Sequence, residues 1–287
     1  MSASLVGSEM CIRDSLVAVR QNIYDSLDIK IDFITYASAT DRDAAFLSGK
    51  LDGMLTDYPG ATLLQAKGSR LRLVMETDGS LSLIASKKSD VRNPDDLKGK
   101  NISVSGNTFV EYATDEVMKQ ACLHPGEVNK PEINNISLRL MMLEDGQISA
   151  SFLPGPATAI ALNNGHTALL NTREMGLRCT GIVFSEKAIT EKDEEIRRFI
   201  TGYNLGVKYL QTHPQNEWTE ILVKEFGLQE KTAMQINLPD YRSATRPSYH
   251  DIEKIIAWLK SKGAIPDYYP GENLVDTTFI PGTLKPQ

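Results

Sequence analysis

Strands and helices alternate along this chain in a pattern that occurs twice, and this repeat limits the fold more than any other feature. Apolar and polar residues alternate over 29–36, while glycines and capping residues mark the ends of the helices that follow. The first copy predicts strands over 29–36, 51–56 and 70–76 and helices over 43–48 and 59–67. Short connections between alternating strands and helices are typical of α/β proteins, so we predict an α/β lobe here.

The same order returns over residues 84–175, which predicts a second lobe of the same kind. Its expected strands cover 101–105, 132–136, 148–153 and 166–170, and its expected helices cover 109–123, 138–145 and 156–161. After a strand over 180–185 the chain is mostly helical, with amphipathic helices over 191–212 and 249–262. We therefore predict two similar α/β lobes and a helical C-terminal part.

Residues 1–15 do not fit this pattern. The string MSASLVGSEMCIRDS begins no periodic element and has neither the basic start nor the apolar run of a secretory signal. We interpret it as translated cloning or adaptor sequence that has replaced a first strand, its loop and any export signal. A native start codon at Met1 would contradict this hypothesis.

The composition of the chain argues against several classes of function. The net charge is −6, and basic residues are scattered, whereas a nucleic-acid-binding protein needs a basic face. No apolar run approaches the roughly 20 residues of a membrane-spanning helix. The 4 histidines lie far apart, and the 3 cysteines, which we expect to be buried free thiols, lack metal-type or redox-type spacing. We expect no metal and no cofactor.

The sequence also lacks the usual signals of catalysis. It contains no G-x-S-x-G nucleophile elbow, no P-loop and no G-x-G-x-x-G motif. Adjacent carboxylates at Asp95 and Asp96, and at Glu194 and Glu195, stand at helix starts, where they are typical of solvated faces or dipole partners. We expect no catalytic residue and no enzymatic activity.

Four loops are candidates for ligand binding, because ligands of open α/β sheets lie outside the carboxyl ends of the strands. These loops follow the strands expected to end near residues 36, 56, 105 and 153. We expect all four to face one cleft. The candidate ligand-binding residues are Tyr36, Ser38, Asp57, Tyr58, Gly106, Asn107, Thr108, Phe109, Glu111, Pro154 and Gly155.

The third of these loops is the strongest polar candidate. Asn107 and Thr108 stand at a helix start, where free N–H groups favour an anion or a polar acceptor, and one of them is expected to cap the helix. Glu111 lies on the first turn of the same helix and is either a dipole partner or a cleft carboxylate.

The first two loops offer different chemistry. Asp57 suits a cationic or amine group, or caps the helix that begins at Pro59. Tyr36 and Tyr58 are candidates for stacking on a flat ring, the alternative being ordinary partial burial.

The middle of the chain resembles bacterial solute-binding proteins. The run NPDDLKGKNISVS over 93–105 is similar to their D-L-K-G-K-x-I-x-V signature, and FLSGKLDG over 46–53 is similar to a motif of their first lobe. LEDGQISASFLPGP over 143–156 and the tail over 263–279 are similar to later family motifs. The resemblance covers roughly 16–280 and points to the branch that binds sulfonates, taurine, nitrate and the pyrimidine precursor of thiamine.

This resemblance implies a type II periplasmic-binding-protein fold whose lobes are joined by two crossover strands, near 77–83 and 178–183. Residues 16–80 and 181–287 would form lobe 1, and 81–180 lobe 2. It further implies the solute-binding component of an ABC importer, periplasmic or lipid-anchored to the outside of the cell membrane. Its expected partners are a small-molecule ligand and the permease and ATPase subunits, with no nucleic acid, and we expect a monomer.

Among these ligands we favour a thiamine pyrimidine. Aromatic residues near the loops offer stacking area, namely Tyr36, Tyr58, Phe109 and Tyr112. The four loops contain no arginine, although a sulfonate or nitrate would be better held by a guanidinium. Many relatives carry an acidic or aromatic residue where this chain has Gly155 between two prolines, so that loop does not identify the ligand.

Two other functions stay open. One is an enzyme on the same fold, similar to a menaquinone-pathway dehydratase or to the eukaryotic thiamine-pyrimidine synthases, whose cysteine-rich segment is absent here. The other is a ligand-sensing domain, which would require a fused transmembrane or DNA-binding segment.

Overall fold

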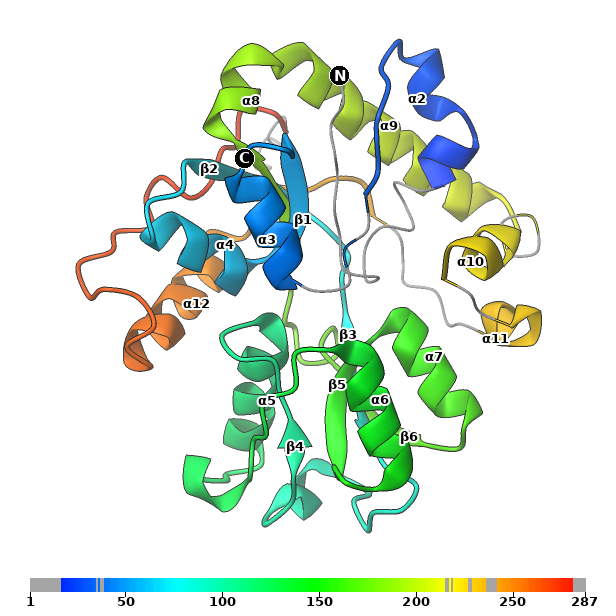
Figure 1. Ribbon diagram of the computed structural model, residues 1–287, viewed down its shortest axis with the longest axis vertical. Coiled ribbons are helices and arrows are strands. Elements are labelled where there is room, and N and C mark those ends of the chain that lie inside the picture. The colour runs from blue at the N-terminus through cyan, green and yellow to red at the C-terminus, as the bar shows by residue number, and fades with distance from the viewer. Residues whose placement is uncertain are drawn as a thin grey trace, which may run out of the picture.

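The computed structural model describes residues 17–34, 36, 39–214, 217, 219–226, 229–235 and 242–280. Two bodies, each built on its own sheet, are stacked along the long axis of the molecule (Figure 1). We call them the upper and the lower lobe, as they stand in Figure 1. The residue boundaries predicted for the two lobes stay a prediction.

The upper lobe contains a three-stranded sheet in the order β1 (Gly53–Asp57), β7 (Thr180–Ser185) and β2 (Leu71–Glu76), with β7 antiparallel to both neighbours. The lower lobe contains a four-stranded sheet in the order β4 (Ile102–Ser103), β5 (Ala150–Pro154), β3 (Leu81–Ala85) and β6 (Thr167–Asn171). In this sheet only the β4–β5 pair is parallel.

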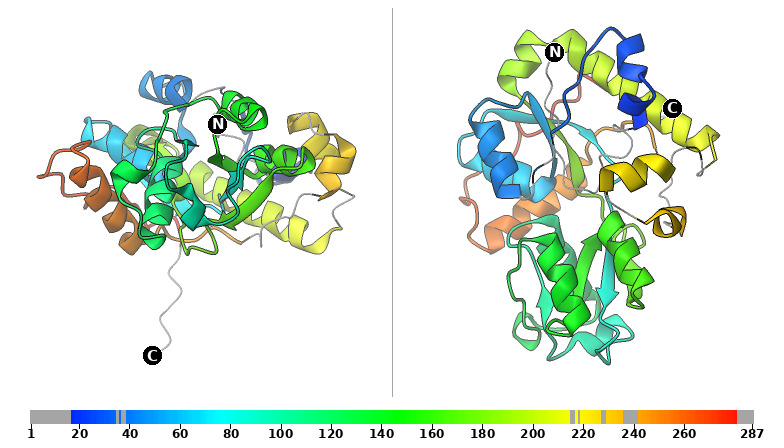
Figure 2. Two further views of the ribbon diagram at one scale, coloured as in Figure 1. Left: turned by 90° about the horizontal axis from the view of Figure 1, so that it is seen from below. Right: turned by 45° about the vertical axis from the view of Figure 1, so that its right-hand side comes forward.

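Helices surround both sheets, and the longest, α9, runs across the top of the upper lobe (Figures 1 and 2). The helices that precede or follow the upper sheet in the chain are α2 (Ile23–Ser26), α3 (Ala39–Leu47), α4 (Tyr58–Ala66), α8 (Glu186–Glu191), α9 (Asp193–Thr212), α10 (Thr219–Phe226), α11 (Glu230–Gln235) and α12 (Tyr249–Ser261). Those of the lower lobe are η1 (Pro94–Leu97), α5 (Phe109–Gln120), η2 (Pro125–Glu127), α6 (Ile136–Asp145) and α7 (Gly155–Asn163).

Side-chain caps explain where several of these helices begin. The side chains of Asp57, Thr108 and Asn135 each accept a hydrogen bond from a backbone N–H two or three residues further on, at the starts of α4, α5 and α6. Each cap satisfies one of the N–H groups that a helix leaves without an internal partner. The predicted capping by Asn107 or Thr108 is confirmed, with Thr108 as the capping residue.

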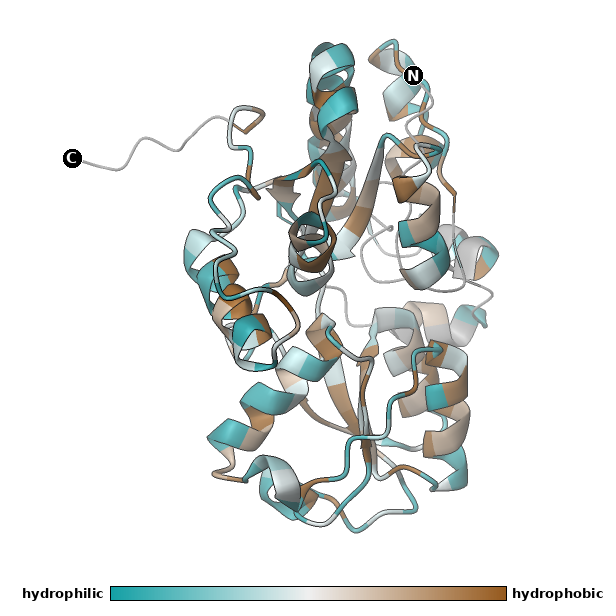
Figure 3. Ribbon diagram, turned by 60° about the vertical axis from the view of Figure 1, so that its left-hand side comes forward, coloured by the Kyte–Doolittle hydropathy of each residue, from teal (hydrophilic) through white to brown (hydrophobic). Residues whose placement is uncertain are grey.

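Apolar side chains fill the space between sheets and helices. Figure 3 shows hydrophobic residues along the strands, while the hydrophilic residues of the helices lie mainly on faces turned outward. One cluster of buried side chains includes Met54 and Leu73 of the upper lobe and Leu83 and Phe152 of the lower lobe. The apolar core therefore continues from one lobe into the other.

The chain crosses between the sheets twice. Residues 77–80 lead from β2 to β3, and residues 172–179 lead from β6 back to β7. The two crossings lie side by side, because the N–H of Thr77 donates to the carbonyl of Thr180 at 3.0 Å and the two hydroxyls are also 3.0 Å apart. These positions overlap the predicted crossovers at 77–83 and 178–183.

Several predicted elements are wrong in detail. Residues 29–36 form no strand in the described part of the chain, where Phe33 is a single bridge residue. An alternating pattern needs a partner strand, and β1 pairs with β7. The strand predicted over 132–136 is reduced to a bridge between Val104 and Glu132, and α6 begins at Ile136. Cys122 is exposed, whereas Cys179 is buried as expected.

Candidate functional site

Asp57 joins two of the predicted ligand loops. It stands at the end of β1, and its Oδ1 accepts a hydrogen bond from the N–H of Gly60, on the first turn of α4, at 2.7 Å. Its Oδ2 accepts from the N–H of Phe109, the first residue of α5, at 2.9 Å. Because α4 packs in the upper lobe and α5 in the lower one, this single carboxylate connects the N-termini of two helices across the two lobes.

Several groups act on the charge of Asp57. Burial raises the pKa of its carboxyl, and it outweighs the hydrogen bonds from Phe109 and Gly60 and the charge of Arg42, which lower it. The N–H groups at a helix N-terminus favour a negative charge. Asp57 is thus a carboxylate that already occupies the anion-favouring ends of both helices.

Arg42 is a residue near these loops that sequence reasoning missed. Its guanidinium is buried beneath the end of β1, where it donates to the carbonyl of Leu55 and to the hydroxyl of Thr56, both at 3.2 Å. It also makes two hydrogen bonds to one oxygen of Asp43, at 2.9 and 2.7 Å. Its place inside α3, rather than in a loop, hid it from a search of strand ends. Its charge is balanced by Asp43.

The loop over residues 106–109 has an unusual backbone. Asn107 has a φ of 54°, in the left-handed region that few non-glycine residues other than asparagine and aspartate adopt. Its N–H donates to Oε2 of Glu111 at 2.7 Å, and the hydroxyl of Thr108 donates to the carbonyl of Ser105 at 2.8 Å. Gly106 lies against the carboxylate of Glu132. The loop is therefore held by its own side chains in the conformation that brings Phe109 to Asp57.

Tyr58 and Phe109 lie in the core and expose almost no surface. Tyr58 is 0% and Phe109 1% exposed. The hydroxyl of Tyr58 donates to Oε2 of Glu76 at 3.1 Å. Tyr58 therefore has no face free for stacking in this conformation.

The other predicted residues are placed as follows. Pro154 ends β5 and is buried, and Gly155 begins α7 with partial exposure. Tyr36 is half-buried and packs against the core cluster that contains Tyr58. Ser38 lies outside the described residues. Five of the candidates are joined by hydrogen bonds or by their place at the start of α5, namely Asp57, Asn107, Thr108, Phe109 and Glu111.

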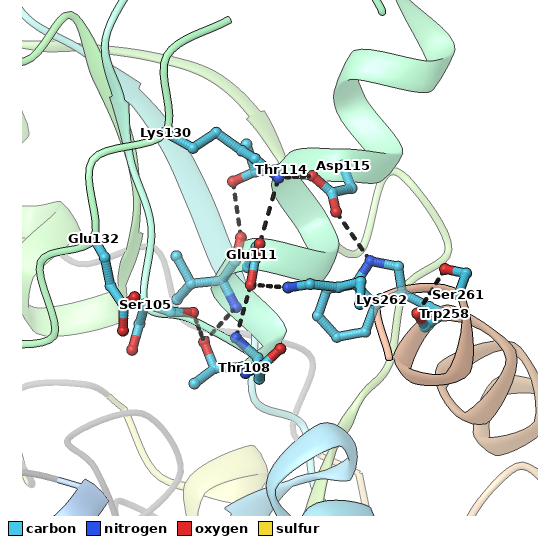
Figure 4. A network of polar contacts seen from close by, with 12 residues as sticks. Ser105, Thr108, Glu111, Thr114, Asp115, Lys130, Glu132, Trp258, Ser261 and Lys262 are labelled. Atoms are coloured by element: carbon cyan, nitrogen blue, oxygen red, sulfur yellow. Dashed lines mark hydrogen bonds and ion pairs between the residues drawn. The ribbon is translucent and has the colours of Figure 1, made fainter. Parts of the chain in front are cut away.

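Glu111 belongs to a network between α5 and α12 (Figure 4). Its Oε2 accepts from Nζ of Lys262 at 2.5 Å, and its Oε1 lies 3.4 Å from Nζ of Lys130. Burial acts to raise the pKa of Glu111, but the hydrogen bond from Lys262 and the other donors outweigh it, so the pKa is lowered. Glu111 is therefore tied to two lysines and to the loop that precedes α5, and its role as a dipole partner or as a cleft carboxylate stays a prediction.

Two surface pockets lie away from the predicted loops. One of about 610 Å³ lies between the region of α2 and the start of α9, lined by charged residues such as Asp28 and Arg198. The other, of about 590 Å³, lies beside the second half of α5 near Cys122 and His124. The predicted loops differ from both pockets in that they bring two helix N-termini and a partly buried carboxylate together.

The described residues hold no group of three or more His, Cys, Asp or Glu side chains that suits a metal ion. Burial raises the pKa of the Cys179 thiol well above its usual value, so this sulfur is not poised as a nucleophile. In the part of the chain that is described, no helix combines the length and apolar character needed to cross a bilayer.

Comparison with known proteins gives one family and one fold. The family model described as NMT1/THI5 like matches residues 14–217. No protein of curated function matches significantly. The periplasmic aliphatic sulphonate binding protein SsuA from Escherichia coli has a TM-score of 0.81 and 13% sequence identity, over 99% of this chain and 95% of that chain.

Two further structures show how widely this fold is used. SsuA from Xanthomonas axonopodis pv. citri, bound to MOPS, has a TM-score of 0.78 and 17% identity, over 92% of this chain and 94% of that one. The desulfurization enzyme DSZB has a TM-score of 0.71 and 12% identity, over 97% of each chain. At such identities the likeness concerns the fold alone. The chain has the two-lobed α/β fold of periplasmic binding proteins and belongs to the NMT1/THI5-like family.

Proposed function

We propose that this chain is the extracytoplasmic solute-binding component of an ABC importer and captures a small organic molecule by closing its two lobes. The observation that carries the proposal is the position of Asp57, which reaches from the end of β1 to the first N–H of α5 in the opposite lobe. Contacts of this kind form and break when two lobes rotate about a pair of crossover segments. Its family and the periplasmic proteins with the same fold support this role.

For the ligand, we propose a small nitrogen heterocycle that carries an amine, such as the pyrimidine precursor of thiamine. Each oxygen of Asp57 accepts one backbone hydrogen bond and keeps a lone pair for a further donor. Arg42, the nearby guanidinium, is already paired with Asp43. The half-buried ring of Tyr36 is the stacking surface that we propose for the heterocycle.

A sulfonate is the second candidate, because MOPS is bound to the Xanthomonas axonopodis pv. citri protein of the same fold. Here it would have to displace Asp57 from the N–H of Phe109 and stay beside a carboxylate of the same charge. We therefore place sulfonates, taurine and nitrate after the pyrimidine.

Thermal denaturation in the presence of candidate solutes tests the proposal. A ligand at a hundred times its Kd stabilises the folded chain by about 2.7 kcal/mol, which shifts Tm by several degrees. We expect such a shift with the thiamine pyrimidine and none with taurine, MOPS or nitrate. A shift with the anions alone would replace the proposed ligand class, and no shift with any solute would count against the binding function.

The substitution Asp57→Asn tests the role of the carboxylate. It removes the charge and keeps one acceptor, so affinity for an amine-bearing ligand should fall by about 10- to 100-fold, the worth of a hydrogen bond to a charged group. Asp52→Asn is the matched control, because Asp52 precedes the same strand but pairs with Lys192 at 2.7 Å. Calorimetric titration should give wild-type affinity for the control. Equal losses in both variants would contradict the assignment.

We propose that the chain acts as a monomer with permease and ATPase subunits as partners, in the periplasm or anchored outside the cell membrane. We also propose that it binds its ligand without converting it. DSZB shows that this fold is compatible with catalysis, so the bound ligand should be recovered from the protein and analysed by mass spectrometry. Recovery of a converted product would support the enzyme alternative.

A further inference from the structure

The contact between α5 and α12 contains charged and aromatic side chains from both lobes (Figure 4). On α5, Glu111 and Asp115 are four residues apart and face the same way. From α12, Nε1 of Trp258 donates to Oδ2 of Asp115 at 2.9 Å, and Nζ of Lys262 donates to Oε2 of Glu111 at 2.5 Å. Since α12 packs on α4, these two hydrogen bonds join the upper lobe to the lower one.

Aromatic contacts fix the same pair of helices. The rings of Tyr112 and Trp258 meet edge to face, with centroids 5.3 Å apart. The ammonium of Lys262 lies 4.6 Å from the centroid of the Trp258 ring, within the range of a cation–π interaction. Trp258 therefore holds Lys262 in place while it contacts α5 itself.

The two lysines of this network belong to different lobes. Lys130 follows η2 in the lower lobe, and its Nζ lies 2.7 Å from Oδ1 of Asp115 and 3.4 Å from Oε1 of Glu111. Lys262 reaches Glu111 from the upper lobe. If the lobes separate, Lys130 stays with the carboxylates and Lys262 leaves. The side chain of Glu111 is only 10% exposed, and after separation its nearest cation would be Lys130, at 3.4 Å, in place of Lys262, at 2.5 Å.

The oxygen that Lys262 contacts also holds the ligand loop. Oε2 of Glu111 accepts from the N–H of Asn107 at 2.7 Å as well as from Lys262. Asn107 has a left-handed backbone, a conformation that asparagine adopts more readily than most residues and that the hydrogen bond to Glu111 holds in place here. The anchor of the 106–109 loop and the link between the lobes thus meet at one atom.

We propose that Lys262 is a positioning residue for the 106–109 loop, which it orders through Glu111 when the lobes close. The inference rests on the proposed function in taking residues 106–109 as a ligand loop. Closure then does two things together: it brings Asp57 to Phe109, and it fixes the carboxylate that holds Asn107. In the open protein the loop is less ordered, so the complete site exists only in the closed form.

Two measurements on the full chain without any ligand test this coupling. Small-angle X-ray scattering gives the radius of gyration, and hydrogen exchange gives the protection of the Asn107 amide. The variants are Lys262→Met, Lys262→Arg and Lys130→Met. Methionine keeps an apolar stem over Trp258 and removes the charge. Lys130→Met is the matched control, because it removes a cation from the same carboxylates within one lobe.

We expect Lys262→Met to increase the radius of gyration and to speed exchange at Asn107 by about tenfold, since a hydrogen bond to a charged group is worth about a decade in an equilibrium. Lys262→Arg keeps the positive charge, so both values should equal those of the wild type. Lys130→Met should lower Tm and leave both values within twofold of the wild type.

The coupling is overturned if Lys262→Met leaves exchange at Asn107 unchanged, or if Lys130→Met has the same effect as Lys262→Met. An increase in the radius of gyration without faster exchange would also overturn it, because closure would then be independent of the loop. These measurements need no ligand. A solute screen that finds no ligand therefore does not contradict the role of Lys262. Conversely, a negative result for Lys262→Met does not contradict the proposed ligand class.

Discussion

Glu76 is a buried carboxyl group at the point where the chain leaves the upper lobe. It ends β2, accepts a hydrogen bond from the hydroxyl of Tyr58 at 3.1 Å, and lies 3.5 Å from the guanidinium of Arg242. Burial raises its pKa to about 7, a rise that Asp251 and Asp78 reinforce and that Tyr58 and Arg242 oppose. Glu76 therefore takes up a proton in a pH range where an exposed glutamate is ionised.

This pKa predicts how stability depends on pH. The folded pKa of about 7 exceeds the ordinary 4.5, so between these values the folded chain binds a proton that the unfolded chain releases. The contribution of Glu76 to the free energy of unfolding is fully present below pH 4.5 and is lost as the pH rises through 7. The total loss is about 3 kcal/mol. Glu76→Gln should remove this loss, as urea unfolding at pH 5 to 8 would show.

Glu253→Gln, at an exposed position of α12, is the control for this experiment. The difference in unfolding free energy between wild type and Glu76→Gln should shift in favour of glutamine as the pH rises, while the control difference stays constant. A difference for Glu76→Gln that is the same at pH 5 and pH 8 would contradict the assignment.

Single residues also show how far sequence reasoning reached. Asp57 and Thr108 could be picked out because strand ends and helix starts are local signals, and both residues stand at such positions. Arg42 and Lys262 carry no such signal. Arg42 acts on a strand end 13 residues away, and Lys262 contacts Glu111 across 151 residues of sequence. Their roles depend on how the elements pack.

At the scale of elements, local signals predicted helices better than strands. The helix expected over 109–123 is α5 (Phe109–Gln120), and that expected over 249–262 is α12 (Tyr249–Ser261). Both carry caps and an apolar face within their own sequence. Among the described residues, the strand expected over 29–36 is reduced to the bridge residue Phe33, since a strand exists only with a neighbour and neither edge of the β1–β7–β2 sheet pairs with it. Pairing of this kind is not encoded in periodicity.

Packing between α2 and α9 makes a second prediction. Gly202 lies in the middle of α9, and a Cβ there would stand 2.3 Å from the ring of Tyr24, which stacks on Phe199 with centroids 5.8 Å apart. Alanine in a helix interior normally stabilises by about 1 kcal/mol over glycine. Here we expect Gly202→Ala to destabilise by about 1 to 3 kcal/mol, because the buried ring must move.

A double-mutant cycle separates these two effects. Tyr24→Ala removes the ring, so Gly202→Ala in that background should become neutral or stabilising. Unfolding free energies from urea titrations give all four corners of the cycle. Destabilisation of the same size in both backgrounds would show that Tyr24 is not the obstacle.

At the scale of the whole molecule, two lobes share one apolar core. The cluster that contains Met54 and Leu73 in the upper lobe also contains Leu83, Phe109 and Phe152 in the lower one. The crossing segments next to it are joined by the hydrogen bonds between Thr77 and Thr180. Loss of either half of this cluster exposes apolar surface on the other half, so the lobes should not unfold independently.

We therefore predict one cooperative thermal transition for the ligand-free chain, measured by differential scanning calorimetry. Phe152→Ala in the lower lobe and Phe199→Ala in the upper lobe each remove a fully buried ring, which should cost about 3 to 5 kcal/mol. Both variants should lower the midpoint temperature of the same single transition, by on the order of 10 °C. Leu47→Ala, at a side chain 58% exposed on α3, should leave it almost unchanged. Two separate transitions, each responding to only one of the phenylalanine variants, would show that the shared core does not couple the lobes.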